Sequence, residues 1–347
     1  MSEFYCIERL KTMKRQEKRS YAHHNFLQTK RVSGPSLLVD GIVWREKICA
    51  WTYSVVDHFV LTRSTVAVSM NLYDRYMGAC GSNSKGSVAL LCSLSTLFIA
   101  VKLHEPKSSL DRFNLAELCK LCRGKYQPKD IEEMELKILQ TLSWLVNPPL
   151  ATDFVSLLLN LLPPAVHPFV SQRMFEMSQY IVELTVCDPF FIGSPPSMIA
   201  FASILNVLEK DIDLLSFSST NRTIFLKEMT NVLSLDRGDN EVRRHRKRMQ
   251  NILSLQDDSI EDVKVPKSPS SVRDIDDELN ESNYNCLEQC LNLKGHKRNP
   301  SADSVNFSKS SKVNGRHRRS SSANSLDFQR MPLACDISHF CSGHARI

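Results

Sequence analysis

The chain has 347 residues, of which 42% are hydrophobic and 24% charged, a composition typical of a globular protein with room for about two domains. Its formal charge of +6 is too small to indicate a nucleic-acid binder by itself, and no P-loop or GxGxxG string suggests a nucleotide-binding enzyme. The most apolar stretch, residues 88–101, falls short of the about 18 apolar residues that a membrane span needs, so we expect no membrane attachment. The 11 cysteines follow an N-terminus without an apolar export signal, and we expect them to be reduced thiols.

Two changes in composition divide the chain into a basic N-terminal segment, a hydrophobic middle and a serine-rich tail. Residues 1–36 are polar and basic, whereas residues 256–347 carry an acidic block followed by a basic block. Segments of this kind bury too little apolar surface to offset the entropy lost on ordering. We therefore expect disordered N- and C-terminal extensions around a folded part at 37–255.

Residues 37–147 predict a compact bundle of five helices. Apolar side chains recur about every 3.6 residues in the first two segments, which is the period of an amphipathic helix. The third segment is apolar on nearly all sides, which predicts a central helix surrounded by the others. The expected helices cover 43–59, 64–77 and 88–103, followed by a short helix capped by Asn114 and a last one that begins at Pro128.

Residues 148–255 predict a second bundle with the same scheme. Pro148 and Pro149 separate it from the first, and its third helix is again apolar on most sides. Two bundles with the same pattern indicate an all-α, duplicated fold. The five helices are expected at 153–162, 167–186, 195–209, 221–234 and 239–254.

The first bundle contains four strings that match one family pattern at nearly unbroken spacing. They are WREKICAW (44–51), NLYDR (71–75), IAVK (99–102) and EMELKILQTL (133–142). Together they resemble the cyclin box, the module by which cyclins bind and activate cyclin-dependent kinases. The family's recurrent positions are here Arg45, Asp74, Leu91, Lys102 and Glu135. The resemblance implies two tandem five-helix cyclin-fold bundles, with the cyclin box at 37–147 and a cyclin-like bundle at 148–255.

The polar members of this pattern suggest two different roles. Arg45 and Asp74 lie on neighbouring apolar helices, where we expect a buried ion pair that supports the cyclin box together with Leu91. Lys102 ends an apolar helix, where a cation also interacts well with the helix C-terminus. The resemblance implies instead that Lys102 and Glu135 hydrogen-bond the kinase's regulatory helix, while Leu103 supplies an apolar contact.

The resemblance implies a regulatory subunit rather than an enzyme. It would bind and activate a cyclin-dependent serine/threonine kinase in cell-cycle progression, in the nucleus and cytoplasm, without a catalytic residue, cofactor or metal. A kinase needs the glutamate of its regulatory helix paired with the lysine that holds the ATP phosphates. A bundle that binds only the inward position of that helix shifts the population toward the active state.

The first helix departs from the family pattern at a candidate docking patch. Many cyclins bind protein substrates or inhibitors there, and the corresponding residues here are Trp44, Ile48 and Trp51. Lys47 stands where the pattern has an apolar residue, and Ala50 stands where it has an acidic one. We therefore expect altered docking or none. The string around these tryptophans resembles D-type cyclins, but the chain lacks an LxCxE string, which favours a lineage-specific cyclin.

Three further features carry alternatives. Cys119-x-x-Cys122 has no second pair or histidine set for zinc, so we expect no metal.

The basic run at 243–248 is typical of a solvated helix face, and a nuclear import signal or an acidic contact is the alternative. A cyclin-fold, transcription-associated protein that contacts nucleic acid would use this run, whereas the kinase interpretation expects no nucleic acid. A cyclin-fold scaffold that binds a kinase without activating it is a third interpretation. The tail offers candidate phosphorylation sites at Ser268, Ser320 and Ser321.

Overall fold

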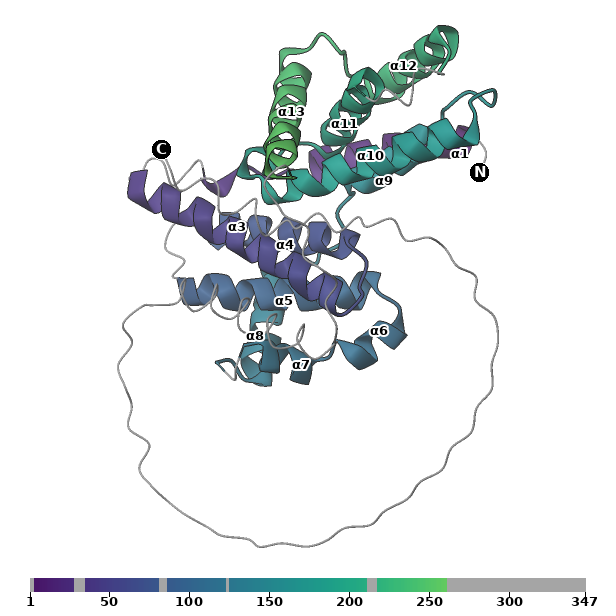
Figure 1. Cartoon of the computed structure of the whole chain (residues 1–347). Helices are drawn as coiled ribbons and strands as arrows, with labels where there is room; N and C mark the ends of the chain where they lie inside the picture. The colour runs from purple at the N-terminus through teal and green to yellow at the C-terminus, as the bar shows by residue number, and fades with distance from the viewer. Residues whose placement is uncertain (1–2, 28–34, 81–85, 123–124, 211–216, 261–347) are drawn as a thin grey trace, which may run out of the picture.

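The structure is a computed structural model that describes residues 3–27, 35–80, 86–122, 125–210 and 217–260. Within these ranges the secondary structure is entirely helical (Figure 1). The helices are α1 (Glu3–Arg19), α3 (Pro35–His58), α4 (Ser64–Cys80), α5 (Gly86–His104), α6 (Lys107–Arg112), α7 (Leu115–Leu121), α8 (Pro128–Thr141), α9 (Ala151–Leu159), α10 (Pro168–Cys187), the 3-10 helix η2 (Pro189–Phe191), α11 (Pro196–Lys210), α12 (Ser219–Leu233) and α13 (Asn240–Ile260).

The first bundle comprises α3 to α8 and is built around α5. This helix contacts α3, α4, α6 and α8, as expected for a segment that is apolar on nearly all sides. Leu94 and Leu97 on α5 are almost fully buried. The Asn114 side chain accepts hydrogen bonds from two backbone N–H groups and caps α7, as predicted. The short helix α6 is an addition to the five helices that the sequence predicts.

The second bundle comprises α9 to α13 and is built around α11. This helix contacts α9, α10 and α13, and Ala200, Phe201 and Ala202 within it have no exposed surface. The duplicated scheme with an apolar third helix is therefore confirmed. Figure 1 shows the two bundles as separate layers, and α10 of the second contacts α3 and α4 of the first.

The N-terminal segment differs from the expectation of disorder, because Glu3–Arg19 forms helix α1. This helix contacts α9 and α12, and Cys6, Leu10 and Met13 enter the core of the second bundle. Their spacing of four and three residues places them on one helix face. Glu17 is also buried, and its carboxylate accepts hydrogen bonds from Ser197 Oγ and the Ser197 backbone N–H at the start of α11. Composition alone does not predict this helix, because the basic residues of the segment outnumber its three buried apolar ones.

Membrane insertion has no support from the helices. Across the described ranges, none of them combines the length and apolar character needed to cross a bilayer.

Candidate functional site

Lys102 and Glu135 meet at the surface of the first bundle. Lys102 lies in the last turn of α5, and its ammonium group forms an ion pair with the Glu135 carboxylate of α8. The Lys102 side chain is 36% exposed and that of Glu135 16% exposed, so the pair sits at the edge of the core. The two residues that the sequence singles out on separate helices are thus brought together, at a place where a partner protein has access to both.

Apolar side chains flank this ion pair. The Lys102 Nζ lies 4.5 Å from the centroid of the Phe98 ring, one turn earlier on α5. Leu103 and Leu136, the next residues along the two helices, are each about half exposed. Single exposed hydrophobic side chains are common in folded domains, whereas contiguous groups of them mark contact surfaces. We call Phe98, Lys102, Leu103, Glu135 and Leu136 the Lys102 surface.

Arg45 and Asp74 form the expected buried ion pair between α3 and α4. The Arg45 Nε and Nη2 atoms each donate to one carboxylate oxygen of Asp74, at 2.8 Å, and the two side chains are 4% and 6% exposed. Burial by itself would lower the pKa of Arg45, but the Asp74 carboxylate raises that pKa above its ordinary value. The guanidinium therefore stays charged in the core.

Arg45 also reaches the second bundle, which the sequence does not reveal. Its Nη1 atom donates to the backbone carbonyl of Cys187, the last residue of α10, at 3.2 Å. The ion pair thus fixes how the two bundles meet as well as how α3 crosses α4. A signal for this contact is absent from the linear sequence because 142 residues separate the two partners.

Further contacts reinforce the joint between the bundles. The Tyr53 hydroxyl of α3 donates to the Glu183 carbonyl of α10 at 3.1 Å, and Arg63 Nη1 lies 3.2 Å from the Glu183 carboxylate. Burial raises the pKa of Glu183, and the nearby Arg63 opposes that shift. The Asn25 side chain donates to the Pro189 carbonyl at 2.9 Å. These contacts hold α10 and η2 against the N-terminal segment and α3.

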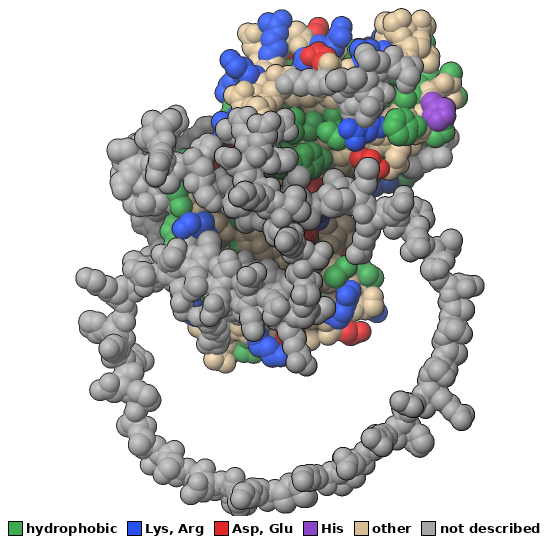
Figure 2. Space-filling view, in the orientation of Figure 1, with side chains coloured by type: hydrophobic (Ala, Val, Ile, Leu, Met, Phe, Trp, Pro, Cys, Tyr) green, Lys and Arg blue, Asp and Glu red, His purple; other side chains and the backbone are tan. Residues whose placement is uncertain are grey.

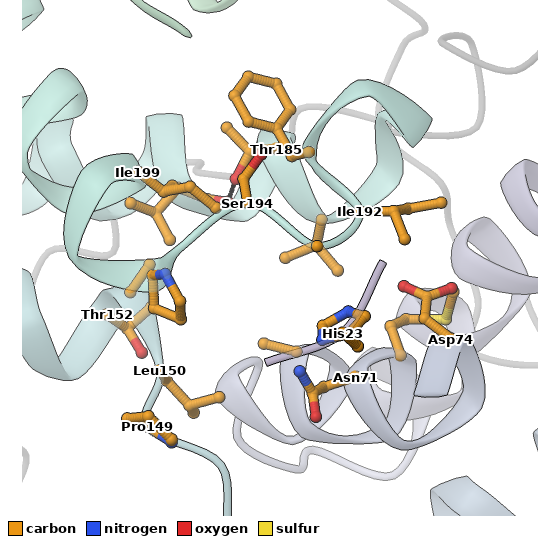
Figure 3. Close-up of a pocket in the computed structure, with 18 of the residues that line it drawn as sticks. His23, Asn71, Asp74, Pro149, Leu150, Thr152, Thr185, Ile192, Ser194 and Ile199 are labelled. Atoms are coloured by element: carbon orange, nitrogen blue, oxygen red, sulfur yellow. Dashed lines mark hydrogen bonds between the residues drawn. The ribbon is translucent and has the colours of Figure 1, made fainter. Parts of the chain in front are cut away.

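A cavity of about 100 Å³ lies within the joint (Figure 3). Asn71 and Asp74 of α4 line one side, and Thr152 and Thr185 of the second bundle line the other. The Asn71 Oδ1 and Thr152 Oγ1 atoms are buried and have no hydrogen-bond partner within the described residues. A cavity of this volume has room for several water-sized molecules.

The candidate docking patch is largely enclosed. Ile48 is 1% exposed and Trp51 is 7% exposed, both in the core of the first bundle, whereas Trp44 is half-buried. Leu91, a member of the family pattern, is partly buried against the same core. The first helix therefore offers little apolar surface from these three positions, and altered docking or none stays a prediction.

The basic run at 243–248 is not a fully solvated face. His245 is buried with its Nε2 2.9 Å from the Ser194 hydroxyl, and Arg246 Nε donates to Asn206 at 3.0 Å. Arg248 Nε donates to the buried Asp188 carboxylate at 2.6 Å. Figure 2 shows blue Lys and Arg side chains with some red acidic ones over the part of the molecule that holds α12 and α13. Because these internal partners occupy several of the cations, the run is a weaker candidate for binding phosphates than its sequence suggests.

Metal ligation finds no support in the described part of the chain, where no group of three or more His, Cys, Asp or Glu side chains is placed to hold an ion. Within α7 and just after it, Cys122 Sγ donates to the Leu118 carbonyl at 3.0 Å, and burial raises the pKa of Cys122 to about 12. A thiol in that state is a poor metal ligand. The candidate phosphorylation sites Ser268, Ser320 and Ser321 lie outside the described residues.

Two family profiles match consecutive parts of the chain. The profile "Cyclin, N-terminal domain" matches residues 8–147, and the profile "Cyclin, C-terminal domain" matches residues 149–233. The first profile begins within α1, and the boundary between them coincides with the start of the second bundle.

Cyclins of several kinds are similar to this chain. The G1/S-specific cyclin-D1 of Danio rerio is 26% identical over 245 residues, which cover 67% of this chain and 80% of that protein. The G2/mitotic-specific cyclin-B3 of Mus musculus is 27% identical over 183 residues, covering 53% of this chain and 12% of that protein. The G1/S-specific cyclin CCN1 of Candida albicans is 26% identical over 162 residues, covering 42% and 23%. The chain thus spans most of this cyclin-D1 and less than a quarter of the other two.

Two solved structures are also similar to this chain. A viral cyclin from herpesvirus saimiri has a TM-score of 0.48 at 19% identity, over 61% of this chain and 85% of that one. The CAK complex from Chaetomium thermophilum bound to ATP-gamma-S has a TM-score of 0.39 at 14% identity, over 85% and 93%. Since the two cyclin domain profiles together match most of the chain, at residues 8–147 and 149–233, the chain belongs to the cyclin family, whose members are regulatory subunits rather than enzymes.

Proposed function

We propose that the protein binds a cyclin-dependent kinase through the Lys102 surface and activates it. The observation that carries the proposal is the meeting of Lys102 and Glu135 at the edge of the core, beside half-exposed leucines. Interface energy usually concentrates in a few such anchors at the centre of a contact.

The chemistry of the ion pair suits the backbone of a partner helix. An ammonium group has three donors and a carboxylate has about four acceptor positions, so each retains hydrogen-bonding capacity when the two are paired. Helix ends carry N–H and C=O groups without intrahelical partners. Lys102 donates to such carbonyls, Glu135 accepts from such N–H groups, and Leu103 and Leu136 cover the apolar side of the same helix.

Activation follows from selective binding of one helix position. The kinase is active only when its regulatory helix brings a glutamate to the lysine that holds the ATP phosphates. The Lys102 surface sits at the end of the rigid central helix α5, which α3, α4 and α8 enclose. A rigid surface that binds the inward position of the kinase helix raises the population of the active state by its differential affinity.

A kinase assay tests this proposal. The rate of peptide phosphorylation is measured for purified cyclin-dependent kinases under three conditions. Each kinase is assayed by itself, with the wild-type protein, and with the variant Lys102→Ala/Glu135→Ala. We expect the wild type to activate the kinase and the variant to reduce that activation at least tenfold, because the variant removes both charges that contact the kinase helix.

A matched control separates the interface from general loss of an ion pair. Lys120 and Glu117 form another lysine–glutamate pair on the same bundle, on α7. The variant Lys120→Ala/Glu117→Ala should activate like the wild type. Activation that survives the Lys102/Glu135 substitution would overturn the proposed contact, and no activation of any kinase would favour a scaffold without activating function.

The same proposal includes cell-cycle control in the nucleus and cytoplasm. Relatives of both G1/S-specific and G2/mitotic-specific type match, so the proposal concerns cell-cycle progression and assigns no phase. Depletion of the protein followed by measurement of cellular DNA content tests it, and an unchanged distribution would contradict it.

A further inference from the structure

Two buried cysteines face each other across the joint between the bundles. Cys49 belongs to α3 of the first bundle and Cys187 ends α10 of the second, 138 residues later. Their Sγ atoms lie 3.2 Å apart, and the residues are 0% and 1% exposed. Because a disulfide bond is about 2.05 Å long, a closure of about 1 Å would join the two sulfurs.

The surroundings hold this pair in place. Arg45 lies one helical turn before Cys49, and its guanidinium donates to the Cys187 carbonyl at 3.2 Å while bound to Asp74. The Tyr53 hydroxyl, one turn after Cys49, donates to the Glu183 carbonyl one turn before Cys187. Contacts on both sides therefore align α3 and α10 at the two sulfurs.

A small oxidant has space close to this pair. The cavity of about 100 Å³ in the joint is lined by Arg45 and by Val186, which precedes Cys187. Hydrogen peroxide is little larger than water and both donates and accepts hydrogen bonds, so the cavity suits it.

We propose that Cys49 and Cys187 form a reversible disulfide that links the two cyclin bundles, with hydrogen peroxide as the oxidant. One thiolate attacks a peroxide oxygen, so that an S–O bond forms, the O–O bond breaks and the leaving hydroxide takes up a proton to give water. The second thiolate then attacks the sulfenic sulfur, so that the S–S bond forms, the S–O bond breaks and a second water leaves. Two thiols and one peroxide thus give one disulfide and two waters.

The link would be a modification of the joint and stands independently of the proposed kinase contact. Disulfides in reducing compartments are usually transient and redox-sensing. A covalent bond here fixes α10 against α3, so that the second bundle cannot turn relative to the first. Thiol reductants reverse the bond by exchange.

Peptide mapping of the wild-type protein tests the proposal directly. Trypsin cleaves after Lys47, Arg63, Arg173 and Lys210, which places Cys49 and Cys187 in the peptides 48–63 and 174–210, each with a single cysteine. The folded protein is treated with hydrogen peroxide, the remaining thiols are alkylated in denaturant, and the digest is analysed by mass spectrometry without reductant. We expect the two peptides joined, lighter by two hydrogen atoms than their sum, and released by dithiothreitol.

Controls separate the native joint from random oxidation. The variant Cys187→Ala should lose the joined peptide, while Cys92→Ala, which removes a buried cysteine on α5, should keep it. A sample unfolded before peroxide treatment should lose the preference for this pair. The proposal is overturned if Cys49 and Cys187 are recovered alkylated at a peroxide dose that oxidises the exposed Cys80, or if they join only after unfolding.

Discussion

Removal of the Asp74 carboxylate should leave a stranded charge at the centre of the joint. In the variant Asp74→Ala, the Arg45 guanidinium loses two hydrogen bonds of 2.8 Å and keeps the one to the Cys187 carbonyl. The Arg45 side chain is 4% exposed, so the guanidinium stays out of bulk water, and only the few molecules that the adjoining cavity holds can approach it. An arginine side chain stays protonated in proteins, so the guanidinium does not escape by deprotonation.

The expected loss is large for a single substitution. Breaking a buried ion pair by removing one partner costs about 3–5 kcal/mol, whereas replacement of both partners by apolar residues is often close to neutral. We therefore expect Asp74→Ala to lower the free energy of unfolding by about 4 kcal/mol. The double variant Arg45→Met/Asp74→Ala should recover at least half of that loss, since it removes the stranded charge.

Urea unfolding followed by far-ultraviolet circular dichroism measures both values by linear extrapolation. The difference between the single and double variants isolates the cost of the unpaired guanidinium. A loss below about 1 kcal/mol for Asp74→Ala, or a double variant no more stable than the single one, would refute the reasoning, because the pair would then be solvated or replaceable.

Two further predictions concern the second bundle. Leu10→Ala on α1 should lower the free energy of unfolding by about 3 kcal/mol, because the side chain is fully buried, and an unchanged urea midpoint would show that α1 does not pack there. Burial lowers the pKa of His245 below its ordinary value of 6.5. At a pH between the folded and unfolded pKa values, the histidine is therefore protonated in the unfolded chain and neutral in the folded one. Its contribution to stability is therefore present above pH 6.5 and lost as the pH falls through the folded pKa. Urea midpoints against pH should decline less steeply in His245→Asn, and parallel curves for the two proteins would contradict this sign.

The fold was largely predictable because each helix carries its own periodic signal. The apolar surround of residues 88–103 already predicts the central position of α5. The approach of Arg45 to Asp74 was also predictable, since a charge on an apolar helix needs a partner on a helix beside it. Composition does not reveal helix α1, because its three buried apolar residues, such as Leu10, are few among many lysines and arginines.

The joint between the bundles could not be predicted from local patterns. The contacts of Cys187 with Arg45 and Cys49 connect positions about 140 residues apart, and backbone carbonyls leave no trace in a sequence. The internal partners of Arg246 and Arg248 were hidden for the same reason. Charge runs are read as solvated by default, but on a helix one side of such a run must face the neighbouring helices.

An exchange of the two charges tests the proposed kinase contact most directly. The variant Lys102→Glu/Glu135→Lys keeps an ion pair between α5 and α8 but exchanges the positions of the positive and the negative charge. Its unfolding should match that of the wild type within about 1 kcal/mol, since exposed pairs contribute little. Its affinity for the kinase, measured by titration calorimetry, should fall on the order of 100-fold, because like-charge and unpaired polar contacts replace complementary ones. A folded exchange variant that binds and activates the kinase as well as the wild type would contradict the account.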